Sequence, residues 1–331
     1  MSSPTLNDIA RQAGVSKMTV SRALRSGHHV REELRVRIVR TAEEMGYRPD
    51  PEFAKMMTHM RRGRARSSPR QLAFVWAEQE AETISRSSWS QQLLQGAQRQ
   101  ALRLGFELEE FYLAARGMTG RRLSGILEAR GIPGFILSPL ISRSRGHVSM
   151  DWEKFSSVVI GLGYARPQLH RVHHHHYLGM MTALRMLKKE GFRRIGFYCG
   201  STINERMFRA WSASFLAHHP LPQPGGLLAL RKSPSKGDFL AWMKSTRPEA
   251  VIDGSHVVKP WMDATHRDSR PRHITLAWRP DQPDVAGIDQ QAEVLGAAAM
   301  DLLVTQYRQN ERGIPATPKV VMTEGLWRPA S

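Results

Sequence analysis

The sequence has a single cysteine, Cys199, fewer acidic than basic residues, and no hydrophobic run long enough to cross a membrane. One cysteine excludes an intramolecular disulfide framework and is typical of a reducing compartment. The first ten residues, MSSPTLNDIA, lack the apolar stretch of a signal peptide. A transmembrane helix needs about 20 consecutive apolar residues, and no run approaches that length. These absences predict a cytoplasmic protein with no membrane partner.

Motifs of common enzymes are also missing. The sequence has neither a Walker A segment nor a Gly-x-Ser-x-Gly elbow, and Gly161 and Gly163 lack the third glycine of a dinucleotide fingerprint. Cys199 closes an apolar strand, which favours a packing role over that of a nucleophile. The four adjacent histidines at 173–176 face different directions on any element, so they do not form a four-ligand metal site. We therefore predict no enzyme, no cofactor and no metal.

Basic residues dominate what is present. The 331 residues carry a net charge of +18, with 41% hydrophobic and 24% charged residues, which suits a globular protein of two or three domains. Residues 1–70 hold 15 Lys and Arg against 7 Asp and Glu. A basic N-terminal part is expected of a protein that neutralises nucleic-acid phosphates. The charge of +10 left on residues 71–331 indicates either general basicity or an anionic ligand.

The N-terminal stretch 5–47 predicts three short helices. Apolar residues recur at helical spacing over 6–13, 17–24 and about 31–45. Gly14 follows the first helix and can adopt the positive φ that ends a helix. Ser16 stands at the N-cap position of the second helix. Two short helices joined by a Gly-bearing turn form a helix-turn-helix, which the third helix can cover.

The second helix has the chemistry of a recognition helix, which reads base edges in the major groove. Lys17 and Arg22 can donate to guanine acceptors, and Met18 can pack on a thymine methyl group. The same outer face carries Ser21 and Arg25. Short donors suited to phosphate oxygens are Thr5, Ser16, Thr19, Ser21 and His29. The alternative is a plain three-helix bundle with solvated charges.

The stretch TLNDIARQAGVSKMTVSRAL, followed by GYRP at 46–49, resembles the DNA-binding head of the lactose-repressor (LacI/GalR) family of bacterial transcription regulators. The resemblance implies a helix-turn-helix domain at 1–49 and a hinge helix with a linker at 50–70. It also implies an α/β core at 71–331 for effector binding and dimerisation, two-lobed like periplasmic sugar-binding proteins. A homodimer on a near-palindromic operator, with a repressor role and an affinity modulated by a small effector, is the expected function.

The boundary segment 50–70 fits a hinge in composition. Pro49 and Pro51 interrupt the preceding helix, and apolar residues then recur at helical spacing before an arginine-rich run. By resemblance, Met57 takes the place of the family's minor-groove leucine, with Met56 as the neighbouring alternative. Apolar wedges of this kind can unstack a base step. A methionine stripe that packs on the core is the other interpretation.

After residue 70, short apolar strands alternate with helices, which predicts α/β units with parallel sheets. Strands are expected at 71–77, 106–113, 134–140, 156–163, 193–200, 225–230, 250–254, 273–278 and 319–327. Helices are expected at 90–105, 119–130, 177–190, 205–218, 236–245 and 292–308. By resemblance, the first lobe comprises 71–165 with 288–318, and the second 166–287 with 319–331.

The positions at which the family holds its effector are rich in His and Arg in this sequence. By resemblance, the effector-binding residues are His174, His175, Arg206, Ser255, His256, Arg279 and Gln290. Arg209 competes with Arg206 for the place of the family's cleft arginine. Carboxylates and amides normally hold sugar hydroxyls, whereas guanidinium and imidazole suit carboxylate or phosphate groups. The pattern favours an anionic effector, and surface placement of these basic residues is the alternative.

Two other classes of protein stay open. An enzyme with a helix-turn-helix appendage would need a catalytic constellation, which the sequence does not offer. An architectural DNA binder would use the same basic surface and would bind random and selected DNA with equal affinity.

Overall fold

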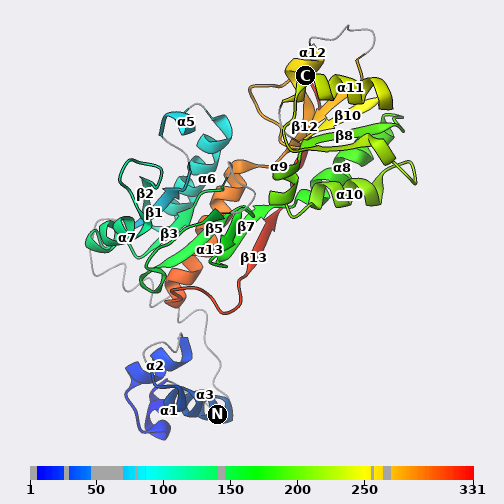
Figure 1. The fold of residues 1–331 in the computed structure, drawn as a ribbon. Helices are drawn as coiled ribbons and strands as arrows, with labels where there is room; N and C mark the ends of the chain where they lie inside the picture. Colours follow the sequence, from blue (N-terminus) through cyan, green and yellow to red (C-terminus); the bar gives the residue numbers. More distant parts are fainter. Residues whose placement is uncertain are drawn as a thin grey trace.

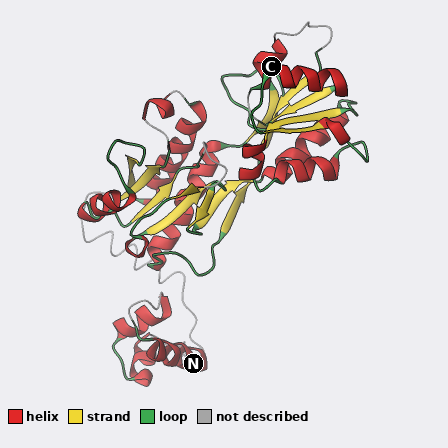
Figure 2. Cartoon of the chain, viewed as in Figure 1, coloured by secondary structure: helices red, strands yellow, loops and turns green. Residues whose placement is uncertain are grey.

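A computed structural model of the chain describes residues 6–25, 30–45, 70–78, 81–85, 87–140, 146–254, 257–263 and 270–331. These residues form a helical head and two α/β lobes (Figure 1). In each lobe, helices flank a central sheet (Figure 2). None of the helices in these ranges is both long and apolar enough to cross a bilayer.

The head consists of α1 (Leu6–Ala13), α2 (Lys17–Arg25) and α3 (Glu32–Glu44), within about a residue of the predicted bounds. Gly14 adopts a φ of +68°, and the next amide, of Val15, donates to the carbonyl of Ala10. Ser16 Oγ accepts from the amide of Thr19 at 3.1 Å, the bond expected of an N-cap. One apolar cluster from all three helices fixes their arrangement: Ile9, Ala10, Ala13, Val20, Ala23, Ile38 and Ala42.

The sheet of the first lobe is parallel throughout, with the strand order β13-β7-β5-β3-β1-β2. Its strands are β1 (Arg70–Trp76), β2 (Phe106–Tyr112), β3 (Gly134–Leu137), β5 (Ser156–Ile160), β7 (His170–His174) and β13 (Val320–Thr323). Helices α6 (Ser88–Leu104) and α13 (Ala292–Gln309) pack on the face that carries Leu72, Phe74 and Trp76. Helix α7 (Gly120–Ala129) packs on the other face. Two short pieces, α5 (Ala81–Ser85) and the 3-10 helix η1 (Trp152–Lys154), complete the lobe.

Helices α6 and α13 approach each other closely because two glycines face across the contact. A Cβ atom on Gly96 would lie 2.0 Å from the carbonyl oxygen of Glu293, and one on Gly296 would lie 2.0 Å from that of Leu93. Real Cβ atoms do not come that close, so this helix pair requires glycine at both positions.

The second lobe has the strand order β14-β12-β11-β10-β8-β9, parallel except for the antiparallel edge strand β14. Its strands are β8 (Ile195–Gly200), β9 (Leu228–Arg231), β10 (Ala250–Asp253), β11 (Arg272–Thr275), β12 (Ala286–Asp289) and β14 (Leu326–Arg328). Its helices are α8 (His176–Lys189), α9 (Ser201–Arg206), α10 (Ala210–His218), η2 (Gly225–Leu227), α11 (Lys236–Thr246) and α12 (Val258–Asp263). Cys199 is fully buried among these elements, in agreement with a packing role.

The predicted lobe boundaries at 166 and 319 are wrong by one strand each. Strand β7 belongs to the first sheet. Its sequence, HRVHH, did not predict a buried strand because four of its five residues are polar, although every one is buried. The predicted strand 319–327 is two strands in different sheets, β13 and β14, since the chain changes lobe at 324–325. The chain therefore crosses between the lobes near 175, 290 and 324.

The predicted helix 205–218 is also two helices. Phe208 and Arg209 adopt φ values of 51° and 59° between α9 and α10, a conformation that interrupts a right-handed helix. Strand β12 and helices α5 and α12 were not expected from the sequence. A small sheet of β4 (Gly146–His147) and β6 (Tyr164–Arg166) lies outside the main sheets.

The three crossings are joined by hydrogen bonds. The amide of His175, in the first crossing, donates to the carbonyl of Thr323 at 2.9 Å. The side-chain amide of Gln291, in the second, donates to the carbonyl of Glu324 at 2.7 Å. Asp289 accepts from the amide of Gln291 and binds Arg328 through Oδ2. The crossings therefore form one connected unit.

Candidate DNA-binding and effector sites

The outer face of α2 presents the side chains predicted to read bases. Lys17 and Arg22 are exposed, and Met18 is 62% exposed, which is unusual for a large apolar side chain. Val20 and Ala23, on the opposite face, are buried in the core of the head. The same helix thus separates a packed side from a basic side that can enter a groove.

The hydroxyl groups before and within α2 are partly engaged inside the head. Ser16 Oγ and Thr19 Oγ1 lie 2.8 Å apart, so one hydroxyl donates to the other and the second keeps a proton for an outside acceptor. A phosphate oxygen is such an acceptor. Thr5, His29, Met57 and the side chains of Ser21 and Arg25 lie outside the described residues, so their predicted contacts stay predictions.

Arg206 is the predicted effector residue that reaches from one lobe toward the other. It ends α9 in the second lobe and is buried, whereas Arg209 is exposed. A Cβ on Gly163 of the first lobe would lie 3.5 Å from Arg206 Cδ. Burial lowers the pKa of the guanidinium, and the negative charge of Glu78 opposes that shift. Of the two arginines that compete in the sequence, Arg206 has the interior position.

Glu78 is a neighbour that sequence reasoning missed. It lies two residues after the end of β1, at the carboxyl edge of the first sheet, and interacts electrostatically with Arg206. The same carboxylate faces Tyr164, whose pKa is raised well above 10, first by complete burial and second by Glu78. Tyr164 Oη donates to the carbonyl of Ser138, at the end of β3, at 2.6 Å. A lone glutamate after an apolar strand gives no distinctive signal in the sequence.

The two predicted effector histidines lie at the first lobe crossing. His174 is 2% exposed, and a Cβ on Gly179 or Gly325 would come within 2.9 or 2.7 Å of its ring. Burial, with help from His173 and His175, lowers the pKa of His174 to about 4, and Asp289 opposes the shift. His174 is therefore neutral at pH 7, which does not support a charged contact to an effector.

His175 has a local role at the same crossing. It is the N-cap of α8, and its Nδ1 accepts from the amide of Leu178 at 3.3 Å. His176, one residue on, is buried and packs edge-on against His174 and Trp211, with ring centroids 5.1 and 5.3 Å away. The histidine run is thus divided between helix capping and packing.

Arg279 and Gln290 follow strands of the second lobe at their carboxyl ends. Arg279 is half-buried, and its side chain has no ion pair with any carboxylate in the described part of the chain. Gln290 donates its side-chain amide to the carbonyl of Leu276 at 2.8 Å, so one of its polar groups is already used. Ser255 and His256 lie outside the described residues.

A hydrogen bond also joins the two lobes near this edge. Ser88 Oγ, at the start of α6 in the first lobe, donates to Asp281 Oδ1 of the second lobe at 3.4 Å.

Comparisons with known proteins agree with this architecture. Residues 5–50 match the family described as "Bacterial regulatory proteins, lacI family". Over 48 residues the chain is 52% identical to the HTH-type transcriptional regulator GntR of Pseudomonas aeruginosa, a match that spans 14% of each protein.

Solved structures extend the likeness to the fold of the core. A complex of the transcriptional regulator CelR with cellobiose aligns with a TM-score of 0.54 at 18% identity, covering 99% of this chain and 100% of that one. A lac repressor dimer bound to operator and the anti-inducer ONPF gives 0.54 at 15% identity, covering 99% and 98%. CCPA from Weissella paramesenteroides with bound glucose gives 0.56 at 13% identity, covering 78% and 97%.

Proposed function

We propose that the chain is a regulator of the lacI type, a homodimeric transcription repressor that binds a near-palindromic operator under the control of a small effector. The cytoplasm is the compartment that this role requires. The observation that carries the proposal is the outer face of α2, where Lys17, Met18 and Arg22 stand exposed on a capped helix. A single head reads one half-site, so two copies related by a two-fold axis read a palindrome.

An in vitro selection of random duplexes with the full chain tests this proposal. We expect enrichment of a near-palindromic site that binds at least about 10³-fold more tightly than random DNA at physiological salt. Equal affinity for selected and random duplexes would instead identify an architectural DNA binder.

For the core, we propose an effector that carries both hydroxyl groups and one acidic group, such as a sugar acid or a sugar phosphate. Arg206 and Arg279 supply guanidinium groups suited to the acidic group. Glu78 supplies a carboxylate that can accept from hydroxyls, in the manner of sugar sites. The solved relatives named with cellobiose and glucose support a sugar-like ligand.

Calorimetry on the full chain separates this proposal from ordinary sugar sensing. Neutral hexoses and disaccharides are compared with uronates, aldonates and sugar phosphates, and the tightest ligand is then measured on Arg206→Ala and Arg279→Ala. We expect an acidic ligand whose affinity falls about tenfold or more in each variant, since charged hydrogen bonds contribute about 1.5–3 kcal/mol. A neutral sugar that binds tightly and is indifferent to both substitutions would refute the acidic-effector proposal and leave operator binding untouched.

Effector control requires that the ligand bind the DNA-competent and DNA-incompetent states of the core with unequal affinity. Residues of the proposed site come from both lobes, Glu78 from the first and Arg206 and Arg279 from the second. A ligand held by both sides therefore favours one relative position of the lobes. That preference can reach the head through the dimer and segment 46–69.

A further inference from the structure

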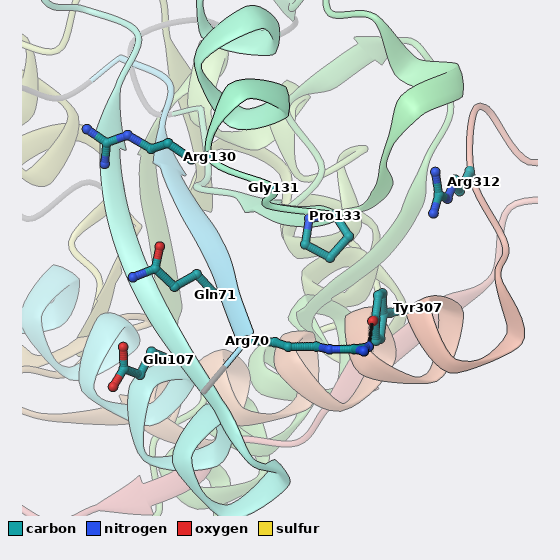
Figure 3. Close-up of a pocket in the computed structure, with 8 residues that line it drawn as sticks. All are labelled: Arg70, Gln71, Glu107, Arg130, Gly131, Pro133, Tyr307 and Arg312. Carbon is teal, nitrogen blue, oxygen red and sulfur yellow. Dashed lines mark hydrogen bonds between the residues drawn. The ribbon is translucent and has the colours of Figure 1, made fainter. Parts of the chain in front are cut away.

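A cavity of about 470 Å³ opens at the amino-terminal edge of the first sheet (Figure 3). Glu78 comes after the end of β1, at the opposite edge. We call this cavity the amino-edge pocket. It lies between the starts of β1 and β2, the end of α7 and the end of α13, and three arginines line it: Arg70, Arg130 and Arg312. None of the predicted effector residues in the described ranges contributes to its wall.

One of the three arginines is already neutralised. Arg130 forms an ion pair with Glu109, and its guanidinium lies 5.6 Å from the centroid of the Phe111 ring. As the C-cap residue of α7, Arg130 is also well placed to complement the negative end of that helix. It therefore has an ordinary structural explanation.

Arg70 and Arg312 differ from Arg130 in having no carboxylate partner within the described ranges, although the Arg70 guanidinium also lies 5.9 Å from the centroid of the Tyr307 ring. Arg70 donates to the hydroxyl oxygen of Tyr307, and Arg312 makes one long bond, 3.5 Å, to the carbonyl of Lys154. Within the described ranges, neither guanidinium lies within ion-pair distance of a carboxylate. The end of α13 does not need Arg312 as a cap, because backbone amides already bond its last carbonyls.

The lining keeps an excess of positive charge. Because Glu109 neutralises Arg130, Glu107 supplies a single carboxylate against the two guanidinium groups of Arg70 and Arg312. In Figure 3, Arg70 extends to Tyr307, Arg312 lies on that same side, and Glu107 points away on the other. Because Arg70 donates to the oxygen of Tyr307, the phenol proton remains free to donate into the pocket.

We propose that the amino-edge pocket binds a phosphate group, held by Arg70 and Arg312 with the Tyr307 hydroxyl as a third donor. Guanidinium groups match the oxygens of a phosphate through paired hydrogen bonds, and a phenol adds a neutral donor. The group can come from a free phosphorylated molecule or from the DNA backbone. Arg70 is the first described residue after segment 46–69, which joins the head to the core, so the pocket opens where the chain arrives from the DNA-binding head.

Two measurements on the full chain distinguish these sources. In the first, calorimetry follows the binding of inorganic phosphate at constant ionic strength, in the absence of DNA. In the second, affinity for a random-sequence duplex is measured against salt concentration, which makes the test independent of operator recognition. Both use Arg70→Gln and Arg312→Gln, with Arg308→Gln as the matched control because Arg308 is exposed on α13 and does not line the pocket.

Saturable phosphate binding that weakens about tenfold in Arg70→Gln and Arg312→Gln, and not in Arg308→Gln, supports the site with a free ligand. Absence of phosphate binding together with a salt slope that falls by about 0.9 in Arg70→Gln and in Arg312→Gln, and not in Arg308→Gln, supports a DNA phosphate. The proposal is overturned if neither the affinity for phosphate nor the salt slope of DNA binding changes in the two pocket variants. It is also overturned if Arg308→Gln behaves like Arg312→Gln, since the effect would then be one of general charge.

Discussion

Acidification below pH 6.5 should destabilise the core through the histidines of the first lobe crossing. Burial lowers the pKa of His174 to about 4, and the charges of His173 and His175 act in the same direction against the opposing Asp289. Burial also lowers the pKa of His173. Burial lowers the pKa of His176 as well, and the positive charge of Arg206 lowers it further. At acidic pH these three histidines therefore bind fewer protons in the folded chain than in the unfolded chain.

The sign and size of the effect follow from proton linkage. An unfolded histidine binds a proton below about pH 6.5, whereas folded His174 binds one only below about 4. The stability is fully present above pH 6.5 and falls as the pH drops from 6.5 toward 4. For His174 alone the loss in the free energy of unfolding is about 1.4 kcal/mol at pH 5.5 and about 2.6 kcal/mol at pH 4.5. His173 and His176 add to the loss.

Urea unfolding at pH 7.5, 6.5 and 5.5, followed by tryptophan fluorescence, measures this effect. His174→Asn removes the titrating group, and His147→Asn, at an exposed histidine, is the control. Between pH 7.5 and 5.5, His174→Asn should lose about 1.4 kcal/mol less stability than the natural chain. If the two lose stability equally, His174 takes up its proton as freely in the folded state as in the unfolded one, and the reasoning fails.

Three further predictions concern the head, the hinge and the helix packing. Arg22→Ala should weaken binding to the selected operator by about 1–3 kcal/mol and relax one base position in a competition assay; an equal loss on random DNA would assign Arg22 to phosphate. Met57→Ala should weaken operator binding more than Met60→Ala if Met57 is the minor-groove wedge, and equal effects in a gel-shift titration would contradict that role. Gly96→Ala puts a Cβ 2.0 Å from a backbone oxygen of α13 and should reduce stability by about 2 kcal/mol or more in thermal unfolding. Gly125→Ala, in open space on α7, should instead stabilise by about 0.5–1 kcal/mol, and similar melting shifts for both would refute the packing argument.

The elements that sequence patterns predicted well are those with regular apolar spacing. Helices α1, α2 and α13 end within a residue of their expected positions because each has an apolar stripe and clear boundary residues. Strand β1 from Leu72 onward and strand β5 from Val158 onward are apolar runs buried on both faces, as parallel sheets require. Local composition was sufficient for these elements.

Elements that depend on distant neighbours could not be predicted in this way. Strand β7 reads HRVHH, and it is a buried strand only because β5 and β13 pair with its two edges. Nothing in the sequence around Phe208 and Arg209 marks the positive φ values that divide α9 from α10, since neither residue is glycine. Glu78 becomes part of a site only when the fold brings it near Arg206.

The crossing between the lobes limits where the proposed effector control can act. His174 fills the space between Gly179 and Gly325 so closely that a Cβ on either glycine would overlap its ring. Hydrogen bonds from His175 to Thr323 and from Gln291 to Glu324 join the three crossing segments into one unit. A unit with this packing has little freedom to shear, because sliding one segment would break bonds to the next and press His174 into backbone. A change in the relative position of the lobes is therefore best accommodated as a rotation about the crossing, which displaces Glu78 and Arg206 relative to each other while the crossing stays intact. On this reasoning, the contacts between lobes that an effector can alter most are those furthest from the crossing.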